Sequence, residues 1–133
     1  MAEIIDPSRS EGDVFTGILD LGVMEQLLSL DDGAVGLLEE MLVLYREDTP
    51  DRIVALEHTI ASGEMVDMAD VAHAIKGAAS TMGAPKVRGF ASELETAGRL
   101  GKQGVDFHLL LEQLKEAYLE SVTALETFLA QQS

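Results

Sequence analysis

Cysteine is absent from this sequence. Its absence excludes disulfide bonds, catalytic thiols and metal sites built on thiolates, although it does not by itself locate the protein in the cell. Tryptophan is absent too, aromatic residues make up 5% of the chain, and there are three prolines. Because 47% of the residues are nevertheless hydrophobic, we expect an all-α protein whose interior is built from Leu, Met and Ala.

Long apolar runs are also missing. No uninterrupted stretch is long enough to cross a bilayer, and the N-terminus has no basic region that leads into an apolar one. The sequence therefore predicts neither a membrane span nor a signal peptide, and we expect a cytoplasmic protein. Its 133 residues fit one domain with a single core. We interpret residues 1–13, which show no hydrophobic periodicity, as a flexible tail, and residues 14–133 as the helical domain.

Basic residues are scarce. The chain has nine basic and 24 acidic residues, and its net charge is −15. This charge argues against nucleic acid or an anionic membrane as a partner. Five of the nine lie between Val71 and Lys102 with only two acids, so this segment carries +3 while the rest carries −18. Such a segment suits a phosphoryl group and an acidic pocket on a partner, although basic residues on short helices also serve solubility.

Several motifs of enzymes and metal sites do not occur. The chain has no G-x-x-x-x-G-K-[ST] loop, no kinase-like glycine loop, no G-x-S-x-G and no H-E-x-x-H. Nucleotide binding and hydrolase chemistry therefore lack support. His58 and His108 have no second ligand one helical turn away, so we interpret both as surface residues and predict no metal site.

Hydrophobic periodicity predicts one short helix and four longer ones. We expect helices over about 21–30, from Asp31 or Asp32 to 62, over 67–82, from 85 to about 100, and over 106–130. Brief connections favour an antiparallel four-helix bundle with a short additional N-terminal helix. Leu30 in the first helix and Phe107 in the last are expected to face inward.

Capping residues and prolines predict where these helices begin and end. Asp20 is expected to cap the first helix and Gly83 to end the third. Pro85 suits the first turn of the fourth helix. In the second helix the apolar phase continues across Thr49-Pro50, which favours one helix kinked at Pro50 over a new helix capped by Thr49.

The helix over 67–82 carries a histidine on its polar side. His73 points almost opposite the apolar face, which is formed by Met68, Val71, Ile75, Ala78 and Met82. Most exposed histidines on helices are merely solvated. Here, however, the neighbours are alanines and Gly77, and a glycine in mid-helix costs about 1 kcal/mol relative to alanine. A helix accepts that cost most readily where another molecule must come close.

The sequence around this histidine matches a known pattern. The motif A-H-x-x-K-G-x-x-S-x-x-G, together with Leu94-Glu95 and Gly98-Arg99 in the order L-E-x-x-G-R, resembles the histidine-containing phosphotransfer (HPt) domains of bacterial and plant multistep phosphorelays. The motif residues are Ala72, His73, Lys76, Gly77, Ser80 and Gly83.

The resemblance implies a phosphoryl carrier rather than an enzyme. His73 is expected to accept a phosphoryl group from a receiver-domain aspartyl phosphate and to pass it to another receiver domain. The expected partners are response-regulator receiver domains and a hybrid histidine kinase. The chain is expected to need no cofactor of its own, because the receiver supplies Mg²⁺, and to be a monomer.

Two further residues are candidates for the chemistry. Lys76 lies one turn after His73, so its ammonium can reach phosphate oxygens, although it can also be a solvated lysine. Glu95 is at the position where several HPt domains place a polar side chain beside the histidine, and a carboxylate there can fix the ring tautomer. Alternatively, Glu95 forms an i,i+4 ion pair with Arg99, and both contacts can hold at once.

A partner is expected to contact the small residues of the histidine helix. These are Ala69, Ala72, Gly77, Ser80 and Gly83. The alternative function is a helical adaptor that binds receiver or kinase domains without being phosphorylated. The presence of His73 together with Lys76 and Gly77 speaks against that alternative.

Overall fold

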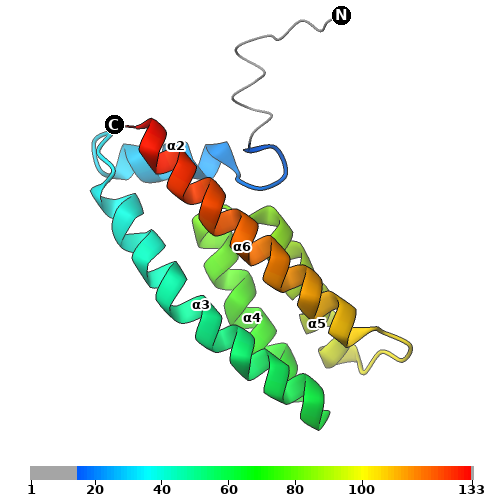
Figure 1. The fold of residues 1–133 in the computed structure, drawn as a ribbon. Coiled ribbons are helices and arrows are strands. Elements are labelled where there is room, and N and C mark those ends of the chain that lie inside the picture. The colour runs from blue at the N-terminus through cyan, green and yellow to red at the C-terminus, as the bar shows by residue number, and fades with distance from the viewer. Residues whose placement is uncertain (1–14, 133) are drawn as a thin grey trace, which may run out of the picture.

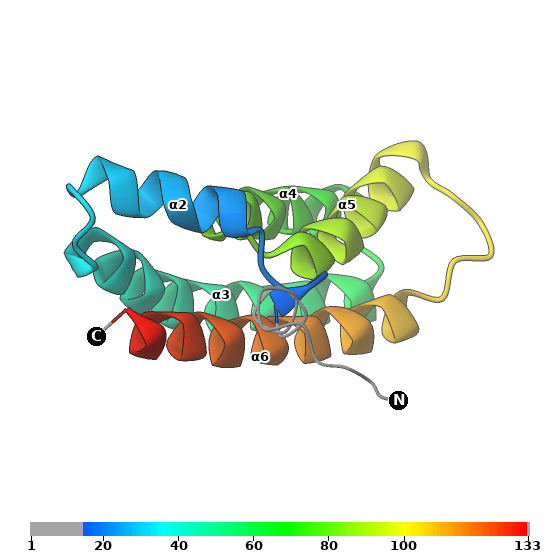
Figure 2. The same cartoon turned by 90° about the horizontal axis from the view of Figure 1, so that it is seen from above.

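The computed structural model describes residues 15–132, and the regular structure of this part of the chain is helical. The helices are α2 (Leu21–Leu30), α3 (Gly36–Ser62), α4 (Met65–Met82), α5 (Pro85–Leu100) and α6 (Phe107–Gln131). Figure 1 shows α3 to α6 running alternately up and down, with each helix packed on the next and α6 returning to α3. Helix α2 packs against α3 and α4 at one end (Figure 2). The predicted antiparallel four-helix bundle with a short additional N-terminal helix is confirmed. The predicted tail over 1–13 lies outside the described residues.

Asp20 caps α2 as the sequence predicted. Its Oδ1 atom accepts hydrogen bonds from the backbone N–H groups of Gly22 at 2.9 Å and Val23 at 3.3 Å. These are donors that the first turn of a helix otherwise leaves without a partner. The start of the short N-terminal helix is therefore determined by the hydrogen bonds of the Asp20 carboxylate.

Two helix starts differ from the prediction. Helix α3 begins at Gly36 rather than at Asp31 or Asp32, because the chain makes a turn over these two residues. The Asp31 carboxylate still acts on α3 from outside it, accepting a hydrogen bond from the Leu37 N–H at 3.0 Å. Helix α4 begins at Met65, two residues before the predicted start.

Helix α3 continues through Pro50. It runs as one element from Gly36 to Ser62 with the proline inside it, so the prediction of one helix is confirmed and the alternative of a new helix capped by Thr49 is wrong. Proline has no N–H and cannot donate to the carbonyl group four residues earlier. Thr49 is fully buried beside it, and its Oγ1 atom has no hydrogen-bond partner among the described residues.

Gly83 ends α4 and also seats α2. Its φ of +67° is in the left-handed region, where a side chain is strained. Its carbonyl oxygen accepts a hydrogen bond from the Asp20 N–H at 2.8 Å. A Cβ atom at this position would lie 3.0 Å from the Cβ of Val23. Glycine is therefore needed here both for the chain reversal and for the contact between α2 and the end of α4.

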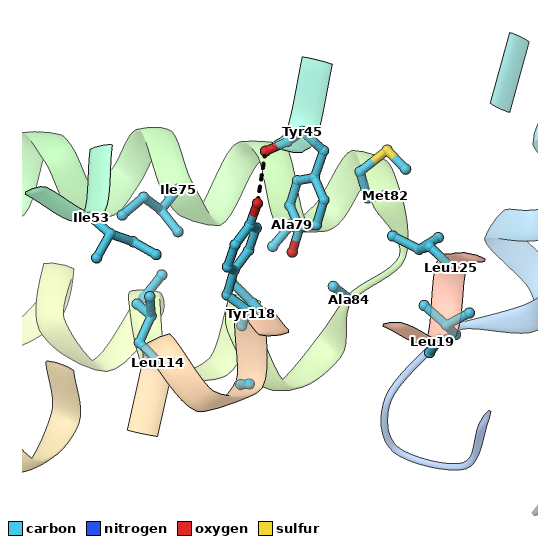
Figure 3. Close-up of a cluster of buried hydrophobic side chains, with 14 of the residues drawn as sticks. Leu19, Tyr45, Ile53, Ile75, Ala79, Met82, Ala84, Leu114, Tyr118 and Leu125 are labelled. Atoms are coloured by element: carbon cyan, nitrogen blue, oxygen red, sulfur yellow. Dashed lines mark hydrogen bonds between the residues drawn. The ribbon is translucent and has the colours of Figure 1, made fainter. Parts of the chain in front are cut away.

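The core runs through the centre of the bundle, and Figure 3 shows part of it, with the Tyr118 hydroxyl donating to the Tyr45 carbonyl oxygen at 3.5 Å. The rings of Tyr45 on α3 and Tyr118 on α6 pack with centroids 5.2 Å apart. The Tyr45 hydroxyl lies 2.7 Å from Ser121 Oγ, which itself donates to the Tyr118 carbonyl at 2.6 Å. Since the serine proton is used, the Tyr45 hydroxyl is the donor of the first bond. Burial raises the pKa of Tyr45 to about 12.

Two residues predicted to face inward do not lie in the core. Leu30 is 75% exposed because it is the last residue of α2, where the chain turns away from the bundle. Phe107 is only half-buried, because it is the first residue of α6 and packs against the edge of the core. In both cases the hydrophobic periodicity correctly predicted which side of the helix faces the bundle. It did not predict that the neighbouring helices leave the helix end uncovered.

The buried tyrosine predicts a loss of stability in alkali. The folded state holds the Tyr45 proton more tightly than the unfolded state, so this contribution is complete below pH 10 and is lost as the pH rises toward 12. Over that range we expect a loss of about 2 kcal/mol, from 1.36 kcal/mol per pKa unit. In Tyr45→Phe the free energy of unfolding at pH 8 should be about 1 kcal/mol lower, and its alkaline decline should be shallower. Urea unfolding at several pH values measures both quantities, and equal declines in the two proteins would contradict the assignment to Tyr45.

Candidate functional site

Helix α4 presents His73 to solvent. The imidazole side chain is 63% exposed, whereas Met68, Ile75 and Met82 on the opposite side of the helix are buried in the core. The predicted orientation of the histidine is therefore confirmed. His58 and His108 are also exposed, as predicted, but no ion pair or hydrogen bond of either side chain is found among the described residues.

A carboxylate from the neighbouring helix holds one ring nitrogen of His73. Glu95 on α5 is only 14% exposed, and its Oε2 atom lies 2.8 Å from His73 Nδ1. Its other oxygen, Oε1, lies 2.6 Å from the ammonium nitrogen of Lys76. The predicted contact between Glu95 and His73 is thus present. Lys76 is not a free solvated lysine, because it forms an ion pair with Glu95. Its contact with phosphate oxygens stays a prediction.

The alternative contact of Glu95 is present as well. Arg99 Nη2 lies 3.5 Å from Glu95 Oε2, the same oxygen that faces His73. The second guanidinium nitrogen, Nη1, donates to Asp70 Oδ1 at 3.0 Å. Sequence reasoning missed Asp70. Its position three residues before His73, on the same side of α4, is the signal that could have pointed to it.

These contacts fix the charge on Glu95. The hydrogen bond from Lys76 lowers the pKa of this carboxyl group, partial burial opposes that effect, and the hydrogen bond with His73 adds to it. An ionised carboxylate can only accept a hydrogen bond, so in the neutral imidazole the proton resides on Nδ1. The lone pair is then on Nε2, which bonds to none of the residues that the structure describes. The site offers a solvent-facing nucleophilic nitrogen.

Gly77 and Ser80 lie on the exposed side of α4, one and two turns after His73. A Cβ atom added at Gly77 would meet nothing within 4 Å, so the fold itself has no need of glycine there. Together with Ala74, Gly77 forms one wall of a groove of about 370 Å³ between α3 and α4. The predicted open surface beside the histidine is therefore present at these positions.

Three of the predicted partner-contact residues are buried. Ala69 and Ala72 have 0% exposure, and Gly83 is also buried, so the prediction that a partner touches them is wrong. Gly83 is small for the reasons given above. Ala69 is small because α5 comes very close to α4: a Cβ atom on Gly98 would lie 2.8 Å from the Met65 carbonyl oxygen and 3.1 Å from the Ala69 Cβ.

No group of three or more metal-binding side chains occurs between residues 15 and 132. In the same part of the chain, no helix combines the length and the apolar character that a membrane span requires.

Comparison with known proteins agrees with this geometry. Residues 40–131, which include the whole of α4 and α5, match the family of Hpt domains. The chain belongs to this family. Its role is accordingly histidine phosphotransfer in phosphorelays, in which Hpt domains interact with receiver domains and histidine kinases.

The fold is similar to that of a protein whose crystal structure is known. That protein is histidine-containing phosphotransfer protein B (HptB) from Pseudomonas aeruginosa PAO1. It is similar to this chain with a TM-score of 0.74 and 24% sequence identity, over 87% of this chain and 97% of that one. No curated protein sequence matches the chain.

Replacing each of two mid-helix glycines with alanine tests the close approach of α4 and α5. At Gly77 the added methyl group meets no atom, so Gly77→Ala should raise the free energy of unfolding by about 1 kcal/mol. At Gly98 the same methyl group meets backbone at 2.8 Å, so Gly98→Ala should lower it by about 1–3 kcal/mol. Urea unfolding of the two variants gives the comparison. Stabilisation by both substitutions would show that the helices are not held this close.

Proposed function

We propose that this protein is a phosphorelay intermediate whose His73 accepts a phosphoryl group from a receiver-domain aspartyl phosphate and passes it to another receiver domain. The observation that carries the proposal is the exposed His73 ring, with Nδ1 held by an ionised Glu95 and Nε2 bonded to none of residues 15–132. The family implies histidine phosphotransfer, and this geometry supports His73 as the phosphoryl acceptor and Nε2 as the reacting atom.

The proposed transfer is an in-line exchange of one bond for another. The Nε2 lone pair forms the N–P bond as the P–O bond to the receiver aspartate breaks, and that aspartate leaves as a carboxylate. The proton on Nδ1 stays in place, and the positive charge that develops on the ring lies 2.8 Å from the Glu95 oxygen. The reverse sequence returns the phosphoryl group to the aspartate of a second receiver.

Lys76 is proposed to stabilise the moving phosphoryl group. Its ammonium contacts Glu95 Oε1, whereas His73 uses Oε2, so Lys76 can leave the carboxylate without breaking the bond to the ring. Its side chain is 30% exposed and lies one turn from the histidine. A cation that follows the phosphoryl oxygens offsets their charge in the transition state.

The remaining parts of the reaction are assigned to the partner. We propose that the receiver supplies Mg²⁺ and the acidic residues that bind it, while this chain contributes the histidine, Lys76 and Glu95. The receiver is proposed to dock over Gly77 and Ser80, where the surface is open. A monomeric cytoplasmic carrier between a hybrid histidine kinase and a response regulator is the arrangement that we infer from these assignments.

The alternative, an adaptor that binds these domains without phosphorylation, requires no nucleophile. The hydrogen-bonded tautomer of His73 and the lowered pKa of Glu95 have no use in such a protein. Phosphorylation of the purified protein distinguishes the two functions directly.

A labelling experiment tests the assignment to His73. A phosphorylated receiver with Mg²⁺ should label the protein, and the label should be labile in acid and stable in base. His73→Gln should abolish labelling with the bundle still folded, whereas His58→Gln and His108→Gln should keep it. ATP with Mg²⁺ alone should give no label, because the sequence has no nucleotide-binding motif. Label that persists in His73→Gln, or that comes from ATP alone, would contradict the proposal.

Two open glycines give a matched test of the docking surface. Gly77 on α4 and Gly89 on α5 both lie in mid-helix, and an added Cβ would meet no atom within 4 Å at either position. Arginine at each should preserve or slightly raise the free energy of unfolding, because the mid-helix glycine penalty is removed. Gly77→Arg should block phosphoryl transfer by filling the contact surface, while Gly89→Arg should transfer at the normal rate. Equal rates in both variants would show that receivers do not dock at Gly77.

A further inference from the structure

Glu95 contacts the side chains of His73, Lys76 and Arg99, and these contacts are divided unequally between its two oxygens. Among the described residues, Lys76 alone contacts Oε1, at 2.6 Å. His73 and Arg99 share Oε2, at 2.8 and 3.5 Å. The carboxylate therefore carries one cation on the side away from the histidine and one on the same side. If Lys76 departs, Arg99 remains beside Oε2.

Arg99 is paired with two carboxylates, whereas Lys76 makes the shorter contact with Glu95. Its guanidinium lies between two carboxylates, with Nη1 on Asp70 of α4 at 3.0 Å and Nη2 on Glu95 of α5. A planar guanidinium presents its donors in a fixed fork, whereas a lysine ammonium is a point charge on a flexible stem. Arg99 is thus held from both helices, while Lys76 is held by Glu95 alone among the described residues.

We propose that Arg99 is a positioning residue: when Lys76 leaves Glu95 to accompany the phosphoryl group, Arg99 keeps Glu95 charged and seated on His73 Nδ1. The proposal rests on the proposed function, because it assigns Lys76 to the phosphoryl group during transfer. The two cations on Glu95 then have different roles, since Lys76 moves with the phosphoryl group and Arg99 stays on the carboxylate. Arg99 touches neither the phosphoryl group nor the reacting nitrogen, and it acts through Glu95.

A purely structural role for Arg99 makes a different prediction. The Asp70–Arg99–Glu95 contacts also join α4 to α5, and a surface ion pair of this kind contributes at most about 1 kcal/mol to stability. The exposed pair Arg46–Glu126, which joins α3 to α6 at 2.8 Å, provides the matched control. If Arg99 only joined two helices, Arg99→Gln and Arg46→Gln would have the same small effect on unfolding and none on the histidine.

The departure of Lys76 can be imitated in the unphosphorylated protein. Four proteins are compared: the unmodified chain, Lys76→Gln, Arg99→Gln and the double variant. The His73 tautomer is read from ¹⁵N chemical shifts, and the Glu95 carboxyl group is titrated by ¹³C NMR. We expect each single variant to keep the Nδ1–H tautomer, because one cation remains on Glu95. The double variant should lose the preference for this tautomer, and the pKa of Glu95 should rise further than in either single variant. Such non-additivity is the signature of two groups that act on one site.

Transfer kinetics provide the second measurement. Arg99→Gln should slow transfer from a phosphorylated receiver by about ten-fold, the loss of one hydrogen bond to a charged group, although its resting tautomer is unchanged. Arg99→Lys, which keeps a cation, should recover most of the rate, and Arg46→Gln should transfer at the normal rate.

Two results would overturn the inference: additive effects of the two substitutions on the tautomer, or unchanged transfer in Arg99→Gln. The NMR measurements need no phosphorylation. A failure of His73 to accept phosphate would therefore contradict the proposed function separately from the proposed role of Arg99.

Discussion

The close approach of α4 and α5 is the constraint on which the site depends. Gly98 lets the two backbones come so near that any side chain there would collide with the Met65 carbonyl oxygen. Ala69, fully buried on the facing side of α4, allows the same approach. Glu95 lies one turn before Gly98, so this contact places its carboxylate beside the next turns of α4, where His73 and Lys76 are. Packing inside the bundle thus determines the chemistry on its surface.

Once Glu95 is in place, its charge distinguishes the two nitrogens of the imidazole. A carboxylate that stays ionised accepts the Nδ1 proton and leaves the lone pair on the solvent-facing Nε2. Exposure alone would not achieve this, because His58 and His108 are exposed as well. What separates His73 from them is a partly buried, ion-paired carboxylate on a neighbouring helix. The nitrogen that keeps its lone pair is therefore selected by tertiary structure, although the sequence alone indicated the histidine.

The sequence predicted the features that depend on a single helix, such as side-chain orientation and helix ends. It predicted fewer of the contacts between two helices. Helical phase placed His73 outward, and capping chemistry identified Asp20 and Gly83 as helix ends. The sequence also predicts a partner contact for the small residues near the histidine, whereas in the structure Ala69 serves the contact with α5. The hydrophobic periodicity of one helix does not determine the angle at which a second helix packs against it. For the same reason, the sequence gave no role to Asp70. For Glu95 it allowed contacts with both His73 and Arg99, and the structure contains both.

The arrangement also explains how a carrier can release what it accepts. Both cations at the site, Lys76 and Arg99, are already paired with carboxylates in the resting protein. Under the proposed function, a phosphoryl group on His73 would gain the Lys76 ammonium only at the loss of the Lys76–Glu95 pair, so the net attraction would be smaller than that of a free cation. The exposed ring adds little further stabilisation, because water screens its charges. A phosphoryl group held in this way would stay transferable, and the carboxylate that orients the His73 ring would also limit how tightly the phosphoryl group is bound.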